Sequence, residues 1–329
     1  MNRVGGLDSI RFICALWVFF GHGGQPPLML PKDGSLITLA WRAFYGNIFS
    51  GPAAVIVFFV ISGFCIHYPF TEPGKFPRLK EFYTRRFLRL AIPLAVAVPL
   101  SLLAGIELTL FKLSILWSLI AELIYYLCYP ALLNARLRLG SWWGIFAASF
   151  VAALAIAGTN PSAGDYPSYG TSLNWLLGLP CWLLGCLVAE ATRGRASPVV
   201  STPSIWTWRV IIFSAAWACS VMRFHSHFGY PWTLNFFAIL AAFWLYREIA
   251  YRRNVAPPRV LEWAGSWSYS LYLLHPFGGT LFSVIVISTL PAQIYWALMV
   301  AFVLSVCYLF YLVVELPGHA IAREAARRM

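Results

Sequence analysis

The sequence predicts an all-α polytopic membrane protein with about ten transmembrane helices, both termini cytoplasmic. Its composition is the first observation: 60% of the 329 residues are hydrophobic and only 11% are charged, with a mean hydropathy of +0.71. A soluble domain would be roughly a quarter charged. The other observations are apolar runs long enough to cross a bilayer and an uneven distribution of basic residues between them. We expect one integral-membrane domain over residues 1–329.

The predicted spans are apolar runs bounded by charge, proline or glycine. The first could be a signal peptide, but Asp8 and Arg11 interrupt it and no small-residue cleavage site follows, so we interpret it as a retained span. The fourth contains Glu122 and follows the polar Lys112, and could be partly re-entrant. In chain order the spans are 7–25, 52–70, 87–105, 114–133, 143–158, 173–190, 206–223, 232–250, 267–289 and 294–315.

The placement of lysine and arginine predicts the orientation. One set of alternate loops and span ends holds nineteen of them, and the opposite set holds four: Lys32, Arg42, Lys112 and Arg223. Cytoplasmic loops carry the excess of basic residues, so both termini are expected in the cytoplasm. This topology also accounts for the net charge of +12 without nucleic acid as a partner.

Neither cysteine nor histidine spacing predicts a disulfide framework or a metal site. All seven cysteines lie in or beside apolar segments and none forms a CxxC pair, so we expect them to act as small buried hydrophobes. His225 and His227 form an HxH pair in a predicted outer loop, but no third ligand is evident. We therefore expect no metal cofactor.

The stretch "LDSIRFICALWVFFGH" places three ionisable groups in the first span. Arg11 and His22 are eleven residues apart, which in an α-helix puts them on one face and about 16 Å apart along the axis. Asp8, three residues before Arg11, could pair with it. Ionisable groups at membrane depth are usually functional. The alternative is a structural Asp8–Arg11 pair near the interface and a histidine at a helix end.

More polar groups recur at depth or at span ends, and their cost in hydrocarbon predicts that they converge on each other or on a wet cavity. Helix packing is the alternative role for each. Two other histidines, His67 and His319, lie near cytoplasmic span ends and are expected at the interface. The polar groups at issue are Ser62, Glu122, His275 and Glu315.

The cytoplasmic loop from Lys75 to Arg89 is the most basic in the chain. Arg86 and Arg89 would share one helix face at the membrane surface, where guanidinium groups suit phosphate oxygens. Anchoring by anionic lipid is the alternative. This loop has more basic residues than the other cytoplasmic loops, which favours a role in phosphate binding in addition to membrane anchoring.

Six segments together resemble the acyltransferase-3 family of bacterial integral-membrane O-acyltransferases. They are "LDSIRFICALWVFFGH", "VIVFFVISGFCI", "FYTRRFLRLAIP", "LWSLIAELIYYLCYP", "YSLYLLHPF" and "VVELPGHAIAR". The resemblance implies a ten-helix protein of the bacterial cytoplasmic membrane that moves an acyl group, usually acetyl, from acyl-CoA to a hydroxyl of a surface or exported glycan. It covers nearly the whole chain.

The resemblance also implies roles for single residues. Arg11 and His22 match the family's Arg, ten-residue gap, His pattern, with His22 at the essential histidine. Arg86 and Arg89 match its Arg-x-x-Arg pattern, and Trp117, Ser118, Leu119 and Glu122 match its WSLxxE pattern. Two positions depart from it: Ser9 replaces a common glycine, and Leu123 replaces a frequent second acidic residue after Glu122.

Acyl transfer from a thioester to an alcohol needs a base near the hydroxyl, and we expect His22 in that role. A buried carboxylate would orient it, with Glu122 a better candidate than Glu315. A covalent acetyl-histidine is also open. Acetyl-CoA is the expected co-substrate, with its arm along the stripe from Arg11 to His22. The residues expected on the donor side are Arg85, Arg86, Arg89, Ser62 and His275.

The expected partners are membrane lipid and a glycan or lipid-linked oligosaccharide as acceptor. Outer loops 26–51 and 159–172 mix glycine and proline with aromatic residues and could bind a sugar, or could simply connect spans. A polytopic transporter or exporter is the main alternative function, because it also needs polar groups at mid-membrane. A non-catalytic receptor or assembly subunit is the third.

Overall fold

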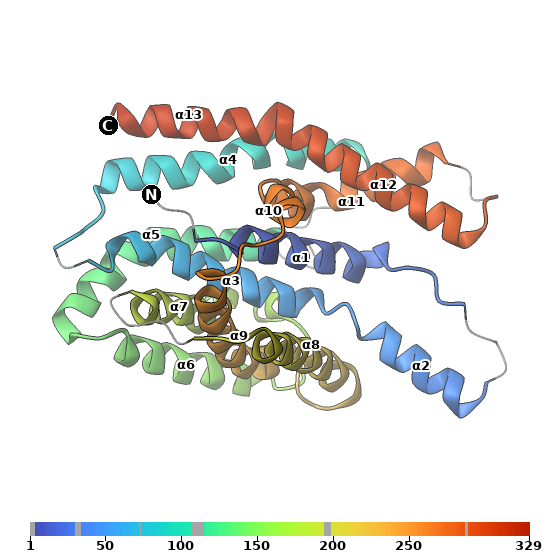
Figure 1. Cartoon of the computed structure of the whole chain (residues 1–329), viewed down its shortest axis with the longest axis horizontal. Helices are drawn as coiled ribbons and strands as arrows, with labels where there is room; N and C mark the ends of the chain where they lie inside the picture. Colours follow the sequence, from blue (N-terminus) through green and yellow to red (C-terminus); the bar gives the residue numbers. More distant parts are fainter. Residues whose placement is uncertain (1–3, 30–33, 73, 107–114, 194–198, 287–288) are drawn as a thin grey trace.

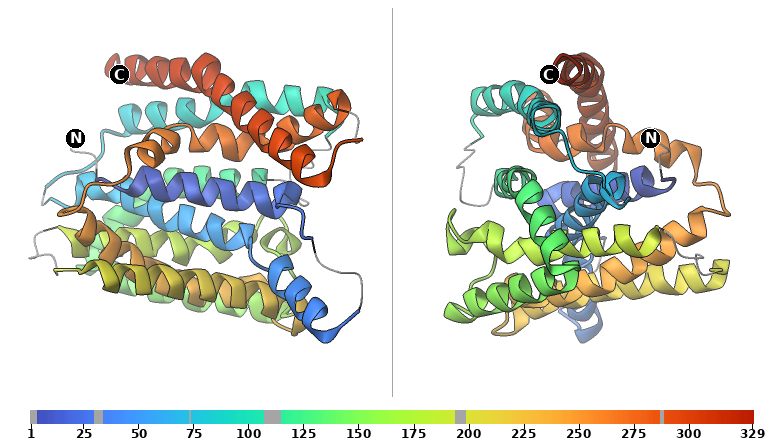
Figure 2. Two further views of the ribbon diagram at one scale, coloured as in Figure 1. Left: turned by 45° about the vertical axis from the view of Figure 1, so that its right-hand side comes forward. Right: turned by 90° about the vertical axis from the view of Figure 1, so that its left-hand side faces the viewer.

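The computed structural model describes residues 4–29, 34–72, 74–106, 115–193, 199–286 and 289–329. All regular secondary structure in these ranges is helical, as predicted. Most of the long helices run in roughly one direction (Figure 2, left). Arg3, Lys32, Lys112 and Arg195, which contributed to the predicted orientation, lie outside the described residues.

Every predicted span coincides with a helix or with a helix and its terminal turn. Helices α1, α3 and α12 are each extended by a short turn of different pitch, at Phe20–Gly24, Tyr68–Phe70 and Tyr311–Glu315. The helices are α1 (Leu7–Phe19), α2 (Leu36–Gly46), α3 (Gly51–His67), α4 (Leu79–Leu103), α5 (Leu116–Leu139), α6 (Trp142–Thr159), α7 (Asn174–Thr192), α8 (Thr202–His225), α9 (Tyr230–Arg252), α10 (Arg259–Gly265), α11 (Ser268–Ile285), α12 (Ala292–Phe310) and α13 (Leu316–Arg327).

Eight helical segments among the described residues are long and apolar enough to cross a membrane, so this is a multi-pass membrane protein. Helices α1 and α11 are not among the eight, and the α-helical part of α1 has only 13 residues. The count of ten spans and the cytoplasmic placement of the termini therefore stay predictions.

Three helices lie outside the predicted spans. Helix α2 forms within the outer loop 26–51, α10 precedes α11, and α13 follows α12. All three are too short to span a bilayer, so a search for long apolar runs does not find them. Helix α13 contains three charged residues and is amphipathic, which is typical of a helix at the membrane surface.

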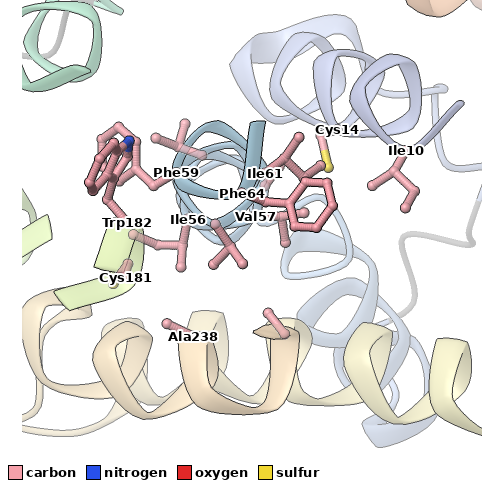
Figure 3. Packing of buried hydrophobic residues seen from close by; sticks show 14 of the residues in the cluster. Ile10, Cys14, Ile56, Val57, Phe59, Ile61, Phe64, Cys181, Trp182 and Ala238 are labelled. Carbon is pink, nitrogen blue, oxygen red and sulfur yellow. The ribbon is translucent and has the colours of Figure 1, made fainter. Parts of the chain in front are cut away.

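Helix α3 lies at the centre of the molecule. Its side chains are apolar all round, and nearly all are buried against α1, α7 and α9. In Figure 3, Ile56 and Phe59 lie on the side of Trp182 from α7, whereas Phe64 lies on the side of Cys14 from α1. Because lipid tails are as apolar as these side chains, close packing between helices rather than water exclusion holds this contact.

The remaining helices lie on either side of this centre. Helices α6, α8 and α9 form a layer on one side, with α7 between them and α3, and α4 and α13 lie side by side on the other (Figures 1 and 2). Helices α1 and α4 begin, and α13 ends, at the same end of the bundle (Figure 1). That shared end brings basic residues from distant parts of the chain together.

Candidate active site

A cavity of about 770 Å³ lies between the central helices and the α4–α13 pair. Its volume falls in the range typical of sites for small molecules and cofactors. Helices α1, α3, α4, α5, α11 and α13 all contribute side chains to its wall. The ionisable side chains of Asp, Glu, His and Arg that line it are Asp8, Arg11, Arg85, Arg86, Arg89, Glu122, Glu315, His319 and Arg323.

The carboxylates in this cavity already have partners within the protein. Asp8 Oδ1 accepts a hydrogen bond from Arg11 Nη1 at 3.0 Å. Glu122 accepts from Ser62 Oγ at 2.7 Å and from the Tyr126 hydroxyl. Glu315 accepts from the backbone and side chain of Ser270. These hydrogen bonds hold the carboxylates in place, and five arginines against three carboxylates leave the cavity with an excess of positive charge.

Four cavity arginines make no ion pair with a carboxylate of the described residues: Arg85, Arg86 and Arg89 on α4, and Arg323 on α13. Arg86 lies between two aromatic rings, 5.9 Å from the ring centre of Tyr126 and 6.0 Å from that of Phe82. Clustered unpaired guanidinium groups create a positive potential and suit the oxygens of phosphate groups. The cavity is thus suited to a polyanionic ligand.

A histidine pair lies beyond the other end of α1. The helix widens into a single π-helical turn over Phe20–Gly24, and Gly23 takes a φ of +100°, which glycine adopts without steric cost. His22 Nδ1 is 2.9 Å from His275 Nε2, and the two rings stack with centroids 5.1 Å apart. His275 is buried, whereas His22 is exposed.

The contacts of His275 assign the protons of both neutral rings. Its Nδ1 is 3.1 Å from the Leu271 carbonyl oxygen and 3.0 Å from the Tyr272 carbonyl oxygen. Carbonyl oxygens only accept, so His275 Nδ1 carries the proton and its Nε2 is an acceptor. His22 Nδ1 must then donate to that acceptor. This leaves His22 Nε2 with a free lone pair, as a general base or a nucleophile requires.

No carboxylate in the described part of the chain hydrogen-bonds to His22. Glu122 bonds to Ser62 and Tyr126, and Glu315 bonds to Ser270, so the expectation that one of them orients His22 is not met. His275 takes that position, because α11 runs beside α1 and brings its ring to the end of that helix. His275 was expected on the donor side and does not line the cavity, whereas Ser62 does.

The other histidine predictions have mixed outcomes. His67 was expected at the interface, but it is fully buried and contacts Tyr129 and Glu190 at 3.0 Å each. Trp142 Nε1 lies 3.0 Å from the same ring. His319 lines the cavity. No group of three or more His, Cys, Asp or Glu side chains in the described ranges could hold a metal ion.

The cavity and the histidine pair are separate in this conformation. Arg11 lines the cavity and His22 does not, so the expected continuous polar stripe is interrupted. Tyr272 lines the cavity, and His275 follows three residues later, about 4.5 Å further along α11. The Tyr272 ring packs on Phe58 at 5.7 Å, and its hydroxyl is 2.6 Å from Ser118 Oγ. Phe58 and Tyr272 thus both belong to the cavity wall, and Tyr272 is the lining residue of α11 nearest in sequence to His275.

A smaller hollow of about 360 Å³ borders the residues after His22. Residues 23–27 form one side, and Tyr295 and Trp296 at the start of α12 form the other. Trp296 Nε1 donates to the Gly24 carbonyl oxygen at 2.8 Å and so ties α12 to the end of α1. In loop 159–172, by contrast, Tyr166 is buried and stacked on Trp117. Sequence reasoning missed the contribution of α12.

Sequence reasoning also missed other parts of the cavity. Cys65 lines the cavity and its Sγ lies 3.3 Å from Arg11 Nη2, while Tyr126 bonds to Glu122. Tyr126 lies four residues after Glu122, on the same helix face, which was the available signal. Arg323 and His319 were also missed as cavity residues, although their spacing of four on an amphipathic segment indicates a shared face.

A family model described as an acyltransferase domain matches residues 4–312. The match includes the helices α1 to α11 and almost all of the α12 segment with its terminal turn, and it ends before α13. No curated protein and no solved structure matches the chain significantly.

Proposed function

This chain belongs to the acyltransferase family, and from that premise we propose that it is a membrane O-acyltransferase that uses acyl-CoA. The acyl group is acetyl or another short chain, and the acceptor is a hydroxyl of a surface or exported glycan in the bacterial cytoplasmic membrane. The observation that carries the proposal is a cavity with four unpaired arginines that ends about one helical turn from a histidine pair.

The donor enters from the end of the bundle where α4 begins. Acyl-CoA carries phosphates on its nucleotide and a long, thin pantetheine arm that ends in the thioester. Arg85, Arg86 and Arg89 bind the phosphates, because they lack carboxylate partners among the described residues. The arm then extends past Arg11 and Ser62 towards Tyr272. This placement keeps the charged nucleotide outside the hydrocarbon region.

His22 Nε2 acts as the general base. It takes the proton of the acceptor hydroxyl while the oxygen attacks the thioester carbonyl, and the carbon–sulfur bond breaks. The CoA thiolate then takes that proton, giving an acyl ester and free CoA. His275 holds the His22 ring through its Nε2 acceptor and so keeps the base nitrogen unprotonated at the start.

Transfer requires the cavity to open towards His22, because neither His22 nor His275 lines it in this conformation. The acceptor reaches the same nitrogen from the side of the 360 Å³ hollow, where His22 is exposed. A donor from the cavity and an acceptor from the hollow thus meet at one base.

The test uses purified protein in lipid nanodiscs with radiolabelled acetyl-CoA and a panel of bacterial oligosaccharides. His22→Ala is expected to reduce transfer by about 10²- to 10⁴-fold, the contribution typical of a general base. His225→Ala is the matched control, because His225 is an exposed histidine at the end of α8, and it should retain wild-type transfer. Undiminished transfer by His22→Ala would refute the role of His22.

The same assay separates the rival functions. A transporter or a non-catalytic receptor would leave labelled acetyl-CoA intact with every acceptor. A covalent acetyl-histidine would appear as label on the protein when acetyl-CoA is added without acceptor, and would be lost in His22→Ala. Direct transfer leaves the protein unlabelled in both cases.

A further inference from the structure

Helix α13 forms a wall of the arginine-lined cavity although it lies entirely outside the segment that matches the acyltransferase family. The match ends at residue 312, and α13 begins at Leu316. His319, Ala322 and Arg323 all line the cavity, opposite the arginines of α4. The cavity is thus incomplete without a helix that the family model does not reach, although the first part of this helix belongs to the "VVELPGHAIAR" segment of the resemblance.

Close packing fixes α13 in this position. Gly318, Ala322 and Ala326 are spaced by four residues and are all buried, so they form one small-residue face along the helix. A Cβ atom at Gly318 would lie 3.0 Å from Ile92 Cγ2 of α4, so only glycine allows this approach without displacing the neighbour. Figure 1 shows α13 lying along α4. The helix is therefore packed against α4 and does not lie free at the surface.

The polar face of α13 leaves two nitrogen-bearing groups without partners. Arg323 makes no ion pair among the described residues, whereas Arg328, directly after the helix, pairs with Glu324 at 3.0 Å. His319 Nε2 is buried and has no hydrogen-bond partner there. Its nearest carboxylate oxygen, Glu315 Oε1, is 3.6 Å away, too far for a hydrogen bond. Arg323 thus keeps unused donor capacity at the cavity, and His319 Nε2 can donate in the tautomer that carries its proton there.

The charge balance of the cavity indicates what these groups bind. Arg85 and Arg86 on one wall face a cavity that Arg323 lines from the other, and like charges around one space repel each other. An anion between the walls removes that repulsion and accepts several charge-assisted hydrogen bonds. A phosphate group has three outward oxygens and can contact both walls at once.

The position of Arg323 indicates which end of the donor it contacts. Glu315 is bonded to Ser270 of α11, deep in the bundle. Arg323 lies eight residues later, about 12 Å further along the helix towards its C-terminal end. Arg85 lies in the second turn of α4, at the same end of the bundle. The two arginines therefore flank the mouth of the cavity, where a donor that inserts its thioester first leaves its phosphates.

We propose that α13 completes the donor site, with Arg323 and His319 binding phosphate oxygens of the nucleotide end of acyl-CoA. This inference rests on the proposed function, because it assigns one wall of the same site. Anionic lipid headgroups carry similar phosphate chemistry, so the test must distinguish the two sources.

The test compares Arg323→Gln with Arg327→Gln, a neighbouring arginine on the same helix that does not line the cavity. Both variants are assayed in nanodiscs of phosphatidylcholine alone, with acetyl-CoA and with acetyl-pantetheine, which lacks the nucleotide. Arg323→Gln should raise KM for acetyl-CoA about ten-fold, the loss typical of one charge-assisted contact, with kcat retained. KM for acetyl-pantetheine should not change, and Arg327→Gln should match the wild type. Arg323→Lys should recover part of the lost affinity.

Three results would overturn the inference. The first is that Arg323→Gln and Arg327→Gln have the same KM for acetyl-CoA. The second is that Arg323→Gln raises KM equally for acetyl-CoA and for acetyl-pantetheine. The third is that Arg323→Gln raises KM only when anionic lipid is added. Arg323 is exposed, so its variants should melt at the wild-type temperature, and a lowered melting temperature in both Arg323 variants would assign it a structural role instead.

Equilibrium binding of labelled acetyl-CoA without acceptor tests the proposed acyltransferase function and the proposed role of α13 separately. If the wild type binds acetyl-CoA but transfers nothing, the proposed function fails, and the weaker binding expected for Arg323→Gln still tests α13. If transfer occurs and Arg323→Gln binds acetyl-CoA as tightly as the wild type, only the inference about α13 fails.

Discussion

The α5–α9 and the α4–α13 regions use the same charged residue types in opposite ways. In the first region, Glu248 accepts two bonds from Arg209, at 2.6 and 3.1 Å, and a third from Arg252 at 3.0 Å. Glu190 likewise lies 2.8 Å from Arg136 and 3.0 Å from His67. Both carboxylates are thus shared between two basic side chains.

In the α4–α13 region arginines line a cavity, and Glu122 and Glu315, which line it too, accept hydrogen bonds from hydroxyl groups and not from these arginines. Among the described residues that line this cavity, five arginines outnumber three carboxylates, so the positive charge is only partly balanced. The comparison teaches that charge alone does not mark a site in a membrane protein. A charged side chain with protein partners holds helices together, and one that lines a cavity without a partner is available to a ligand.

The largest expected effect is on stability, in the α5–α9 region. Glu248→Gln leaves Arg209 and Arg252 close together without a counter-charge, and Glu248 is only 3% exposed. Removing one partner of a buried ion pair costs about 3–5 kcal/mol of unfolding free energy. Thermal unfolding in detergent should detect this loss. Glu324→Gln, whose pair with Arg328 is exposed, is the control and should melt like the wild type. If the two variants melt at the same temperature, the buried ion pairs of Glu248 stabilise the protein no more than the exposed pair of Glu324 does.

An intermediate effect is expected on donor binding in the α4–α13 region. Arg86→Ala removes a cavity arginine without breaking an ion pair of the described residues. KM for acetyl-CoA should rise about 10- to 100-fold, since bonds to charged groups contribute about 1.5–3 kcal/mol. The melting temperature should stay the same or rise, because repulsion from Arg85 and Arg89 is reduced. A large loss of stability with an unchanged KM would show that Arg86 stabilises the fold and does not bind the donor.

The smallest effect concerns salt. If the cavity arginines attract a polyanion, raising the salt concentration from about 0.01 to 0.15 M shortens the screening length from about 30 to 8 Å. KM for acetyl-CoA should then rise a few-fold, and less in Arg86→Ala. The melting temperature should change little, because the buried ion pairs of the α5–α9 region are poorly screened. A KM that is independent of salt would contradict electrostatic capture of the donor.

The helices and several members of the cavity followed from local patterns. Apolar runs located every long helix, and the membrane character and the family are confirmed. The spacing of Arg86 and Arg89 and the isolated carboxylate at Glu122 also pointed to groups that do line one cavity. These predictions succeed because a residue's position on its own helix depends on a fixed rotation per residue and on the length of a bilayer.

The sequence by itself therefore determined an α-helical membrane protein, the faces of its helices and the chemical types of its polar groups. The tertiary structure alone decided that His275 rather than Glu122 contacts His22, that the cavity does not reach this pair, and that α13 forms one wall. The reason is physical. Helical periodicity fixes which residues share a face, but which helices become neighbours depends on side-chain packing over the whole bundle, and a single wide turn at Phe20–Gly24 ends the regular rotation on which the prediction for His22 relied.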